Sequence, residues 1–263
     1  MISTRQFTYR SYDLLKMDKK AIVALRDLMW PVHSACFRRI EDQHLLDFLT
    51  MQGTSLSMVK LALSEQGDPV GYAIIHYLLK DYRGRSIGVW RGASGFLPGY
   101  RGRGNLDTLL FRWGVLYRLK HPIRPMYVFG ASVHPSSYVS MMRGLPKSCP
   151  HYERPTPPRM LELLLFLADD FGMRRVEGAG PTIRDVGWST RQSEQERDYW
   201  ATCDRPAARA YISMNPSYEQ GHGVLVLAPL QPGNMLVGAA GSIVRNLSRR
   251  MRSGSGVLDT GGR

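Results

Sequence analysis

Residues 90–119 constrain the fold most, because they read in order as a strand, a turn rich in glycine and arginine, and an apolar helix. The strand breaks at Pro98 and Gly99. Glycines in a turn leave out side chains that would keep an anion away from the backbone N–H groups. A helix that follows at once presents unpaired N–H groups and the positive end of its dipole. This order predicts a phosphate-binding turn suited to a pyrophosphate.

The two common nucleotide-binding loops do not fit this turn. No Lys-Ser or Lys-Thr pair closes it, and its glycines are not spaced as G-x-G-x-x-G. Residues 101–106 instead read R-G-R-G-N-L, which resembles the Q/R-x-x-G-x-G/A loop of the GNAT superfamily, the acyl-CoA-dependent N-acyltransferases. The chain departs from that loop at Leu106, where the superfamily usually has Gly or Ala. A surface arginine turn without a ligand is the structural alternative.

Strand-like runs surround the turn in the order that the resemblance implies. Residues 58–63 and 70–79 flank a hairpin signal, residues 87–96 lead into the turn after a loop at 80–85, and residues 125–133 follow the helix. A parallel pairing of the last two runs gives a right-handed crossover through the helix. We therefore expect a mixed α/β (α+β), GNAT-like fold: a central twisted sheet flanked by helices, with splayed parallel strands on either side of a cofactor-binding helix.

The resemblance also implies how acetyl-CoA or another acyl-CoA would bind as the donor. In this superfamily the pantetheine arm enters between the two splayed strands, and the acyl carbonyl lies near a bulge in the first of them. That bulge would fall at Gly95, Phe96 and Leu97, whose N–H groups would polarise the thioester carbonyl. The pyrophosphate would bind the turn residues, which are Arg101, Gly102, Arg103, Gly104, Asn105 and Leu106.

Candidate proton-transfer residues follow the second of these strands, in the run HPSSYVSMMRGLP. The superfamily commonly has a tyrosine here that protonates the departing thiolate, which implies Tyr138 as the general acid. His134 is a candidate for accepting the proton of the attacking amine. His76 is a further histidine on a predicted strand, but alternation does not say which face it takes. Packing roles remain open for all three residues.

Helices are predicted on both sides of this central region. Residues 18–48 read as two helices, with Asp18 as the first N-cap and Pro31 expected to end or kink the first helix. Residues 143–158 are rich in proline and predict a loop or lid, and residues 160–171 predict a buried helix. The rest of the chain predicts a connection at 178–191, a helix at 194–212 interrupted by Pro206, a loop at 211–218 and a strand at 223–229.

Composition narrows the class of protein. The chain has 263 residues, a formal net charge of +13 and three widely separated cysteines. Three such cysteines make neither a disulfide framework nor a zinc site, so we expect buried cysteines, a reducing compartment and no metal. No apolar run approaches the ~18 residues of a membrane span, and the first residues are too polar for a secretory signal. We therefore expect a cytoplasmic protein without a transmembrane segment.

We expect one GNAT-like domain over residues 1–232, with an enlarged C-terminal half, and a basic tail over 233–263. The interpretation is a transferase: an N-acyltransferase, such as an N-acetyltransferase, that uses coenzyme A thioesters and an amine attacking directly. One alternative is transfer from an acyl carrier protein, an acidic partner that suits the positive charge, to a specialised-metabolite amine. Another is a non-catalytic module that binds coenzyme A or another anion. No sequence-specific nucleic-acid motif is present.

Overall fold

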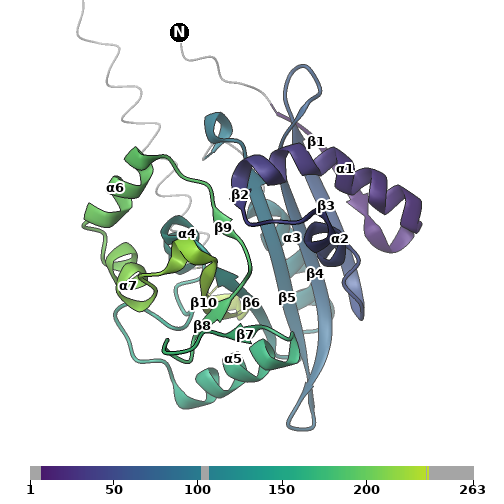
Figure 1. The fold of residues 1–263 in the computed structure, drawn as a ribbon. Coiled ribbons are helices and arrows are strands. Elements are labelled where there is room, and N and C mark those ends of the chain that lie inside the picture. The colour runs from purple at the N-terminus through teal and green to yellow at the C-terminus, as the bar shows by residue number, and fades with distance from the viewer. Residues whose placement is uncertain (1–6, 102–106, 235, 237–263) are drawn as a thin grey trace, which may run out of the picture.

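The computed structural model describes residues 7–101, 107–234 and 236. In this part of the chain one sheet of eight strands forms the centre, and helices cover it (Figure 1). The strand order is β1 (Thr8–Asp13), β3 (Thr54–Leu63), β4 (Pro69–Tyr82), β5 (Arg85–Phe96), β6 (Met126–Ser132), β10 (His222–Pro229), β8 (Ile183–Asp185) and β7 (Arg174–Arg175). The predicted mixed α/β fold class is confirmed.

Strands β3, β4 and β5 form the long antiparallel meander that the alternating apolar runs predicted. The connection between β4 and β5 is shorter than the expected loop at 80–85. Tyr82 pairs with Arg85, and the two residues between them, Arg83 and Gly84, both have positive φ, at 54° and 72°. Two such residues match the right-handed twist of a tight hairpin, so the strands extend almost to the turn.

The one parallel contact among the described strands joins β5 to β6. The chain crosses between them through helix α3 (Asp107–Lys120), which lies against the sheet through Trp113, Val115 and Tyr117. The predicted order of strand, helix and strand is therefore confirmed. The predicted phosphate-binding residues Gly102, Arg103, Gly104, Asn105 and Leu106 lie outside the described residues, as does most of the predicted tail.

Each face of the sheet has its own helices. Helices α1 (Lys19–Cys36) and α2 (Asp42–Leu49) pack on Val59, Leu61 and Tyr72, and α5 (Pro158–Asp170) packs further along the same face on Val89 and Leu225. The opposite face holds α3, α4 (Pro135–Gly144) and α7 (Pro206–Met214). Each fully buried leucine in these layers contributes about 1.5–3 kcal/mol of transfer free energy.

Helix α1 corrects the expectation for Pro31. Asp18 caps the start as predicted, since its carboxylate accepts the N–H of Ala21 at 2.7 Å. The helix then continues through Pro31 to Cys36. Proline removes the hydrogen bond to the carbonyl four residues earlier, that of Asp27. Asp27 and Pro31 are both exposed, so water can solvate that carbonyl while the buried side chains beyond it hold the last turn in place.

The C-terminal half follows the predicted order with two corrections. The helical region breaks before Pro206 as expected, into α6 (Glu194–Thr202) and α7, but α7 continues to Met214, two residues beyond the expected helix and into the run 211–218 that we had expected to be a loop. The connection at 178–191 contains β8 and also β9 (Ser189–Thr190). Strand β9 pairs with β2 (Phe37–Arg38) in a small second sheet. This sheet ties the end of α1 to the C-terminal half.

Candidate functional site

Strands β5 and β6 separate soon after they pair. Their register contains three residue pairs, which are Gly88 with Met126, Val89 with Tyr127 and Trp90 with Val128. Beyond these pairs β5 continues to Phe96 beside β4, and β6 continues to Ser132 beside β10. The two facing edges therefore carry main-chain groups that are not bonded to each other. This is the splayed geometry that the resemblance implied.

The β4–β5 ladder shows which β5 amides face the separated edge. Its register runs without a shift from Tyr82–Arg85 to Gly71–Phe96, so the predicted bulge near Gly95 is wrong. Leu97 donates its N–H to Val70 O at 3.0 Å, whereas Gly88 donates to Pro125 O at 2.8 Å on the opposite side. Because main-chain direction alternates along a strand, Gly92, Ser94 and Phe96 point their N–H groups toward β6.

This alternation refines the predicted carbonyl-polarising set. The N–H of Phe96 points toward β6, so Phe96 stays a candidate. The N–H of Leu97 is bonded to β4, and by alternation the N–H of Gly95 also faces β4. Gly95 has a packing reason instead, since a Cβ there would lie 3.1 Å from Tyr72 Cε1 and 3.3 Å from Cys36 Sγ. Gly92 and Ser94 were not among the residues predicted from the sequence, although the period of two along the strand places their N–H groups on the same side as that of Phe96.

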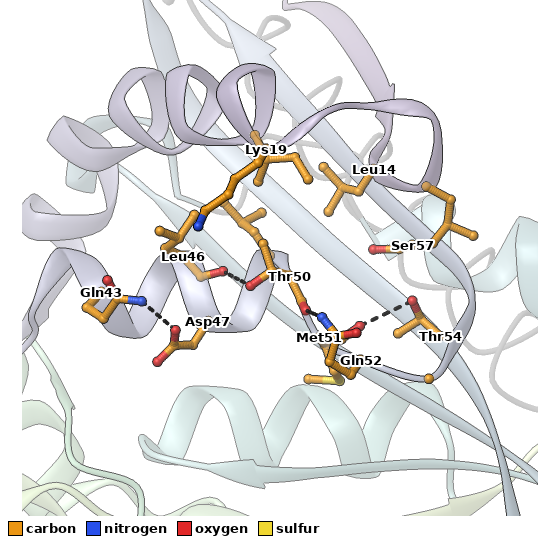
Figure 2. A pocket seen from close by; sticks show the side chains of 14 residues that line it. Leu14, Lys19, Gln43, Leu46, Asp47, Thr50, Met51, Gln52, Thr54 and Ser57 are labelled. Carbon is orange, nitrogen blue, oxygen red and sulfur yellow. Dashed lines mark hydrogen bonds between the residues drawn. The ribbon is translucent and has the colours of Figure 1, made fainter.

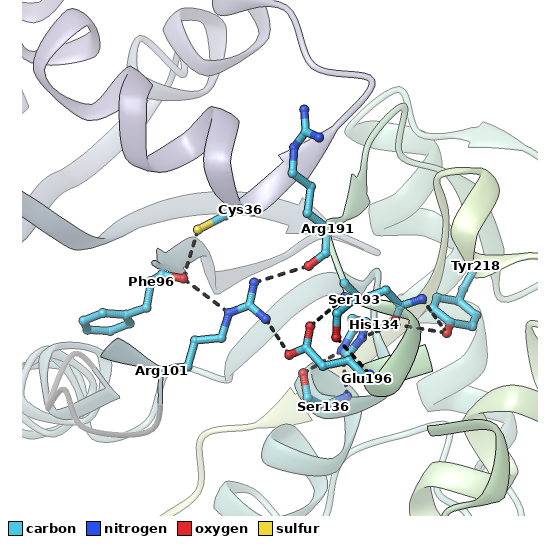
Figure 3. Close-up of polar contacts among 10 residues, drawn as sticks. Cys36, Phe96, Arg101, His134, Ser136, Arg191, Ser193, Glu196 and Tyr218 are labelled. Atoms are coloured by element: carbon cyan, nitrogen blue, oxygen red, sulfur yellow. Dashed lines mark hydrogen bonds and ion pairs between the residues drawn. The ribbon is translucent and has the colours of Figure 1, made fainter. Parts of the chain in front are cut away.

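Arg101 closes the end of β5 against the C-terminal half (Figure 3). Its guanidinium Nη1 lies 2.8 Å from Glu196 Oε1 in an ion pair, Nη2 donates to Arg191 O at 3.3 Å, and Nε donates to Phe96 O at 3.4 Å. Glu196 also belongs to the capping box of α6, where it accepts the N–H of Ser193. A phosphate at Arg101 would therefore compete with a carboxylate.

Cys36 shares the Phe96 carbonyl with Arg101. The thiol donates to Phe96 O at 3.1 Å, and burial raises the pKa of Cys36 to about 11 although Arg101 acts to lower it. The thiol is therefore neutral near pH 7 and unsuited to nucleophilic attack. Cys36, Cys149 and Cys203 are all free and buried, as predicted.

His134 lies at the N-cap of α4 and is buried. Its Nδ1 is 2.7 Å from Ser136 Oγ and its Nε2 is 3.0 Å from Gln192 Oε1 (Figure 3). Trp200 and Tyr218 present their rings edge-on to the imidazole. Burial lowers the pKa of His134, so the ring is neutral near pH 7. A neutral imidazole in a hydrogen-bonded chain can accept a proton.

Tyr138 lies one turn further along α4. Its side chain is fully buried, and its hydroxyl donates to Pro150 O at 2.9 Å. Burial raises the pKa of Tyr138, which keeps the phenol protonated. The phenol thus holds the proton that a general acid needs, while its hydrogen bond anchors the proline-rich segment 143–158. Its role as the general acid stays a prediction.

The face covered by α1, α2 and α5 carries further buried titratable groups. His33 Nδ1 lies 2.5 Å from Tyr72 Oη, and His76 Nδ1 lies 2.9 Å from Ser57 Oγ. Burial lowers the pKa of each imidazole to about 4. Arg91, beside His76 in the β4–β5 register, stacks over the Phe171 ring at 4.1 Å, and burial lowers its pKa to about 10. It therefore stays charged at neutral pH.

A separate pocket of about 770 Å³ opens between the start of α1, helix α2 and the start of β3 (Figure 2). Lys19, Gln43 and Asp47 are among its polar lining residues. Ser57 lines it too and bonds to buried His76. The pocket lies at β3, with β4 between it and the separated edges of β5 and β6. Its position therefore gives no reason to place the predicted chemistry there.

The described residues hold neither a metal site nor a membrane-spanning helix. No group of three His, Cys, Asp or Glu side chains is arranged there to hold a metal ion. Among the described helices, none combines the length and apolar character that a bilayer crossing requires.

No protein-family model matches the chain, and no curated protein sequence matches it. Solved structures that it resembles include a GNAT family N-acetyltransferase from Escherichia coli in complex with CoA, with 15% identity, a TM-score of 0.33, and coverage of 51% of this chain and 67% of that one. A GCN5-related N-acetyltransferase from Kribbella flavida has 14% identity, a TM-score of 0.36 and coverage of 84% and 97%.

A third similar structure is a GNAT superfamily phosphinothricin acetyltransferase from Sinorhizobium meliloti in complex with AcCoA. It has 20% identity, a TM-score of 0.32, and coverage of 53% of this chain and 73% of that one.

Proposed function

We propose that the chain is an acyltransferase that moves an acyl group from acyl-CoA to an amine by direct attack. The observation that carries this proposal is the separation of β5 from β6 after Trp90 and Val128. An extended pantetheine arm has amide groups that can bond to strand edges of this kind. Helix α3 is the next α-helix of the chain after β5, and the N-terminus of a helix suits a pyrophosphate.

In the proposed reaction, Gly92, Ser94 and Phe96 supply the N–H groups that face the thioester. Donors aimed at the carbonyl oxygen stabilise the negative charge that develops during attack. The amine nitrogen forms a bond to the acyl carbon as the carbon–sulfur bond breaks. His134 takes the amine proton, and Tyr138 protonates the departing thiolate. A thioester is already activated, so alignment and proton transfer supply the main part of the acceleration.

Arg101 offers the sharpest test of the donor site. We expect titration calorimetry of the full chain with CoA, acetyl-CoA and a longer acyl-CoA to show saturable one-site binding. Arg101→Ala should weaken that binding about tenfold, because a charge-assisted contact to phosphate is lost. The loss is limited to about this size because a phosphate must first displace Glu196 from Arg101. Arg85→Ala is the matched control, since Arg85 is an exposed arginine at the opposite end of β5.

Glu196→Gln tests the competition directly. The amide can still accept the Ser193 N–H, so the cap of α6 is kept while the ion pair with Arg101 is removed. An ion pair between side chains that are 31% and 43% exposed is worth up to about 1 kcal/mol. CoA should therefore bind about two- to fivefold more tightly to this variant.

Several results would count against the proposal. If no CoA ligand binds, or if Arg101→Ala and Arg85→Ala lose the same amount of CoA affinity, the proposed donor site is refuted. Binding without transfer to any amine indicates a non-catalytic CoA-binding module. Turnover that is faster and more salt-sensitive with an acyl carrier protein than with acyl-CoA moves the donor to that partner.

A further inference from the structure

An exposed serine contacts the buried histidine at the end of β6. Ser136 is the second residue of α4 and lies four residues beyond Ser132, at the end of β6 that has separated from β5. Its side chain is exposed, whereas His134 and Gln192 are buried. The three groups form a chain, with 2.7 Å from Ser136 Oγ to His134 Nδ1 and 3.0 Å from His134 Nε2 to Gln192 Oε1.

The direction of the hydrogen bonds assigns the imidazole tautomer. Gln192 Nε2 donates to the Tyr218 hydroxyl at 3.0 Å, which leaves Gln192 Oε1, an acceptor, facing His134. His134 Nε2 must therefore carry the proton and donate it to Gln192. Its Nδ1 is then an acceptor, consistent with the N-cap bond that it receives from the Ser136 N–H at 3.3 Å. The Ser136 hydroxyl thus points its proton at Nδ1.

We propose that Ser136 relays the proton of the attacking amine to His134, with Gln192 as the positioning residue that fixes the tautomer. This role rests on the proposed acyl transfer. As the carbon–nitrogen bond forms, the amine gives a proton to Ser136 Oγ, and the hydroxyl proton of Ser136 moves to His134 Nδ1. The product is an imidazolium that is protonated on both nitrogens, a neutral Ser136 and a neutral amide. The imidazolium later returns its proton to water, and the Tyr138 phenolate that remains after protonation of the thiolate takes a proton from water, so both groups are restored.

The surroundings of His134 set the pH dependence of this step. Burial, and more weakly Arg101, lower its pKa, while Gln192, Glu196 and Glu219 act in the opposite direction. Tyr218 is a neutral phenol whose own pKa is raised by burial, and Arg197 is paired with Glu219 at 3.3 Å. The base is therefore active above a pKa that lies below 6.5. Activity should rise with pH through that value and then level off.

The neighbouring serine provides a matched control. Ser137 is also exposed, but its hydroxyl donates to the main-chain carbonyl of His134 at 2.7 Å and leaves the imidazole untouched. Ser136→Ala deletes the relay hydroxyl and keeps the backbone N–H that bonds to Nδ1, so the N-cap contact survives. Ser136→Thr keeps a hydroxyl.

The experiment measures kcat, acetyl-CoA affinity and the pH profile for wild type, Ser136→Ala, Ser136→Thr and Ser137→Ala. We expect Ser136→Ala to lose about 10- to 100-fold in kcat with unchanged acetyl-CoA affinity, because proton transfer is impaired and donor binding is not. Threonine should restore most of this loss, and Ser137→Ala should match the wild type. Equal kcat values and pH profiles for the two alanine variants would overturn the relay.

Nitrogen NMR of histidine-labelled full chain gives a readout that does not need turnover. We expect the Nε2–H tautomer of His134 near pH 7, and a higher His134 pKa in Ser136→Ala, because the hydroxyl that bonds to the neutral ring is gone. An Nδ1–H tautomer, or an unchanged pKa, contradicts the relay even when the wild type is active. Failure of the wild type to bind acyl-CoA, with the expected tautomer present, instead refutes the acyl transfer on which the role depends.

Discussion

Gly88 supports the parallel contact between β5 and β6, and replacing it tests the packing behind the site. It pairs with Met126 at the start of the parallel register. A Cβ at this position would lie 2.4 Å from the Tyr77 hydroxyl and 2.6 Å from Tyr77 Cε2. Tyr77 is 1% exposed, and its ring lies between Trp90 and Tyr117, with ring centroids at 4.8 and 4.5 Å. The ring cannot move without disturbing both neighbours.

Gly88→Ala should therefore destabilise the fold. Overpacking of a filled core costs about 1–3 kcal/mol, and the lower entropy of an unfolded alanine chain offsets about 0.4–1 kcal/mol of it. For a domain of this size each kcal/mol shifts Tm by about 2–4 °C. The middle of these two ranges gives a net loss of about 1.3 kcal/mol, which lowers Tm by about 3–5 °C. Calorimetry measures this shift, and the near-ultraviolet circular dichroism of Trp90 should change with it.

Gly130→Ala is the matched control. Gly130 lies on β6, and a Cβ there would meet nothing within 4 Å. The same substitution should leave Tm unchanged or raise it slightly, because only the entropic term acts. If Gly88→Ala were as stable as Gly130→Ala, the close packing of Tyr77 against the parallel pair would be refuted.

Two further predictions concern buried groups. Tyr138→Phe should lower the free energy of unfolding by about 1–2 kcal/mol, because it leaves Pro150 O without its 2.9 Å hydrogen bond. A fall in kcat of more than tenfold at temperatures well below Tm would support a proton-donor role for Tyr138. An unchanged kcat would restrict Tyr138 to packing. His33 and His76 have pKa values of about 4 in the folded chain and near 6.5 in the unfolded chain. Between pH 4 and pH 6.5 the unfolded chain therefore binds more protons than the folded chain. Stability should be complete above pH 6.5 and decrease as pH falls toward 4, and His76→Gln should make the fall in Tm shallower over that range. A Tm that is flat from pH 6.5 to 4 would contradict the burial of both imidazoles.

The elements that the sequence predicted well are those with local causes. The β3–β4 hairpin, the crossover through α3 and the break before Pro206 each follow from residues adjacent in the chain. Helix α1 does not end at Pro31, because tertiary burial of Val32, His33 and Cys36 outweighs one lost helical hydrogen bond at an exposed position. A local rule states the cost of a proline but not the packing that offsets it.

The site was harder to predict because its contacts span long stretches of chain. Arg101 was identified, but its partner Glu196 lies 95 residues further on and had no sequence signal. Gln192, which fixes the tautomer of His134, is 58 residues from it. Ser136 could have been found, since a serine two residues after an N-cap histidine is within reach of its imidazole. Arg91 looked like an ordinary strand residue, and only the fold brings Phe171 over it.

The small sheet of β2 and β9 changes how the separated strands can behave mechanically. At one end, three parallel residue pairs join β5 and β6. At the other end, three contacts join the two halves of the chain: the β2–β9 pairing, the hydrogen bond from Arg191 N to Cys36 O, and the Arg101–Glu196 ion pair. The separated parts of β5 and β6 are thus fixed relative to each other at both ends. The folded chain therefore sets the distance between the two strands by contacts at both ends.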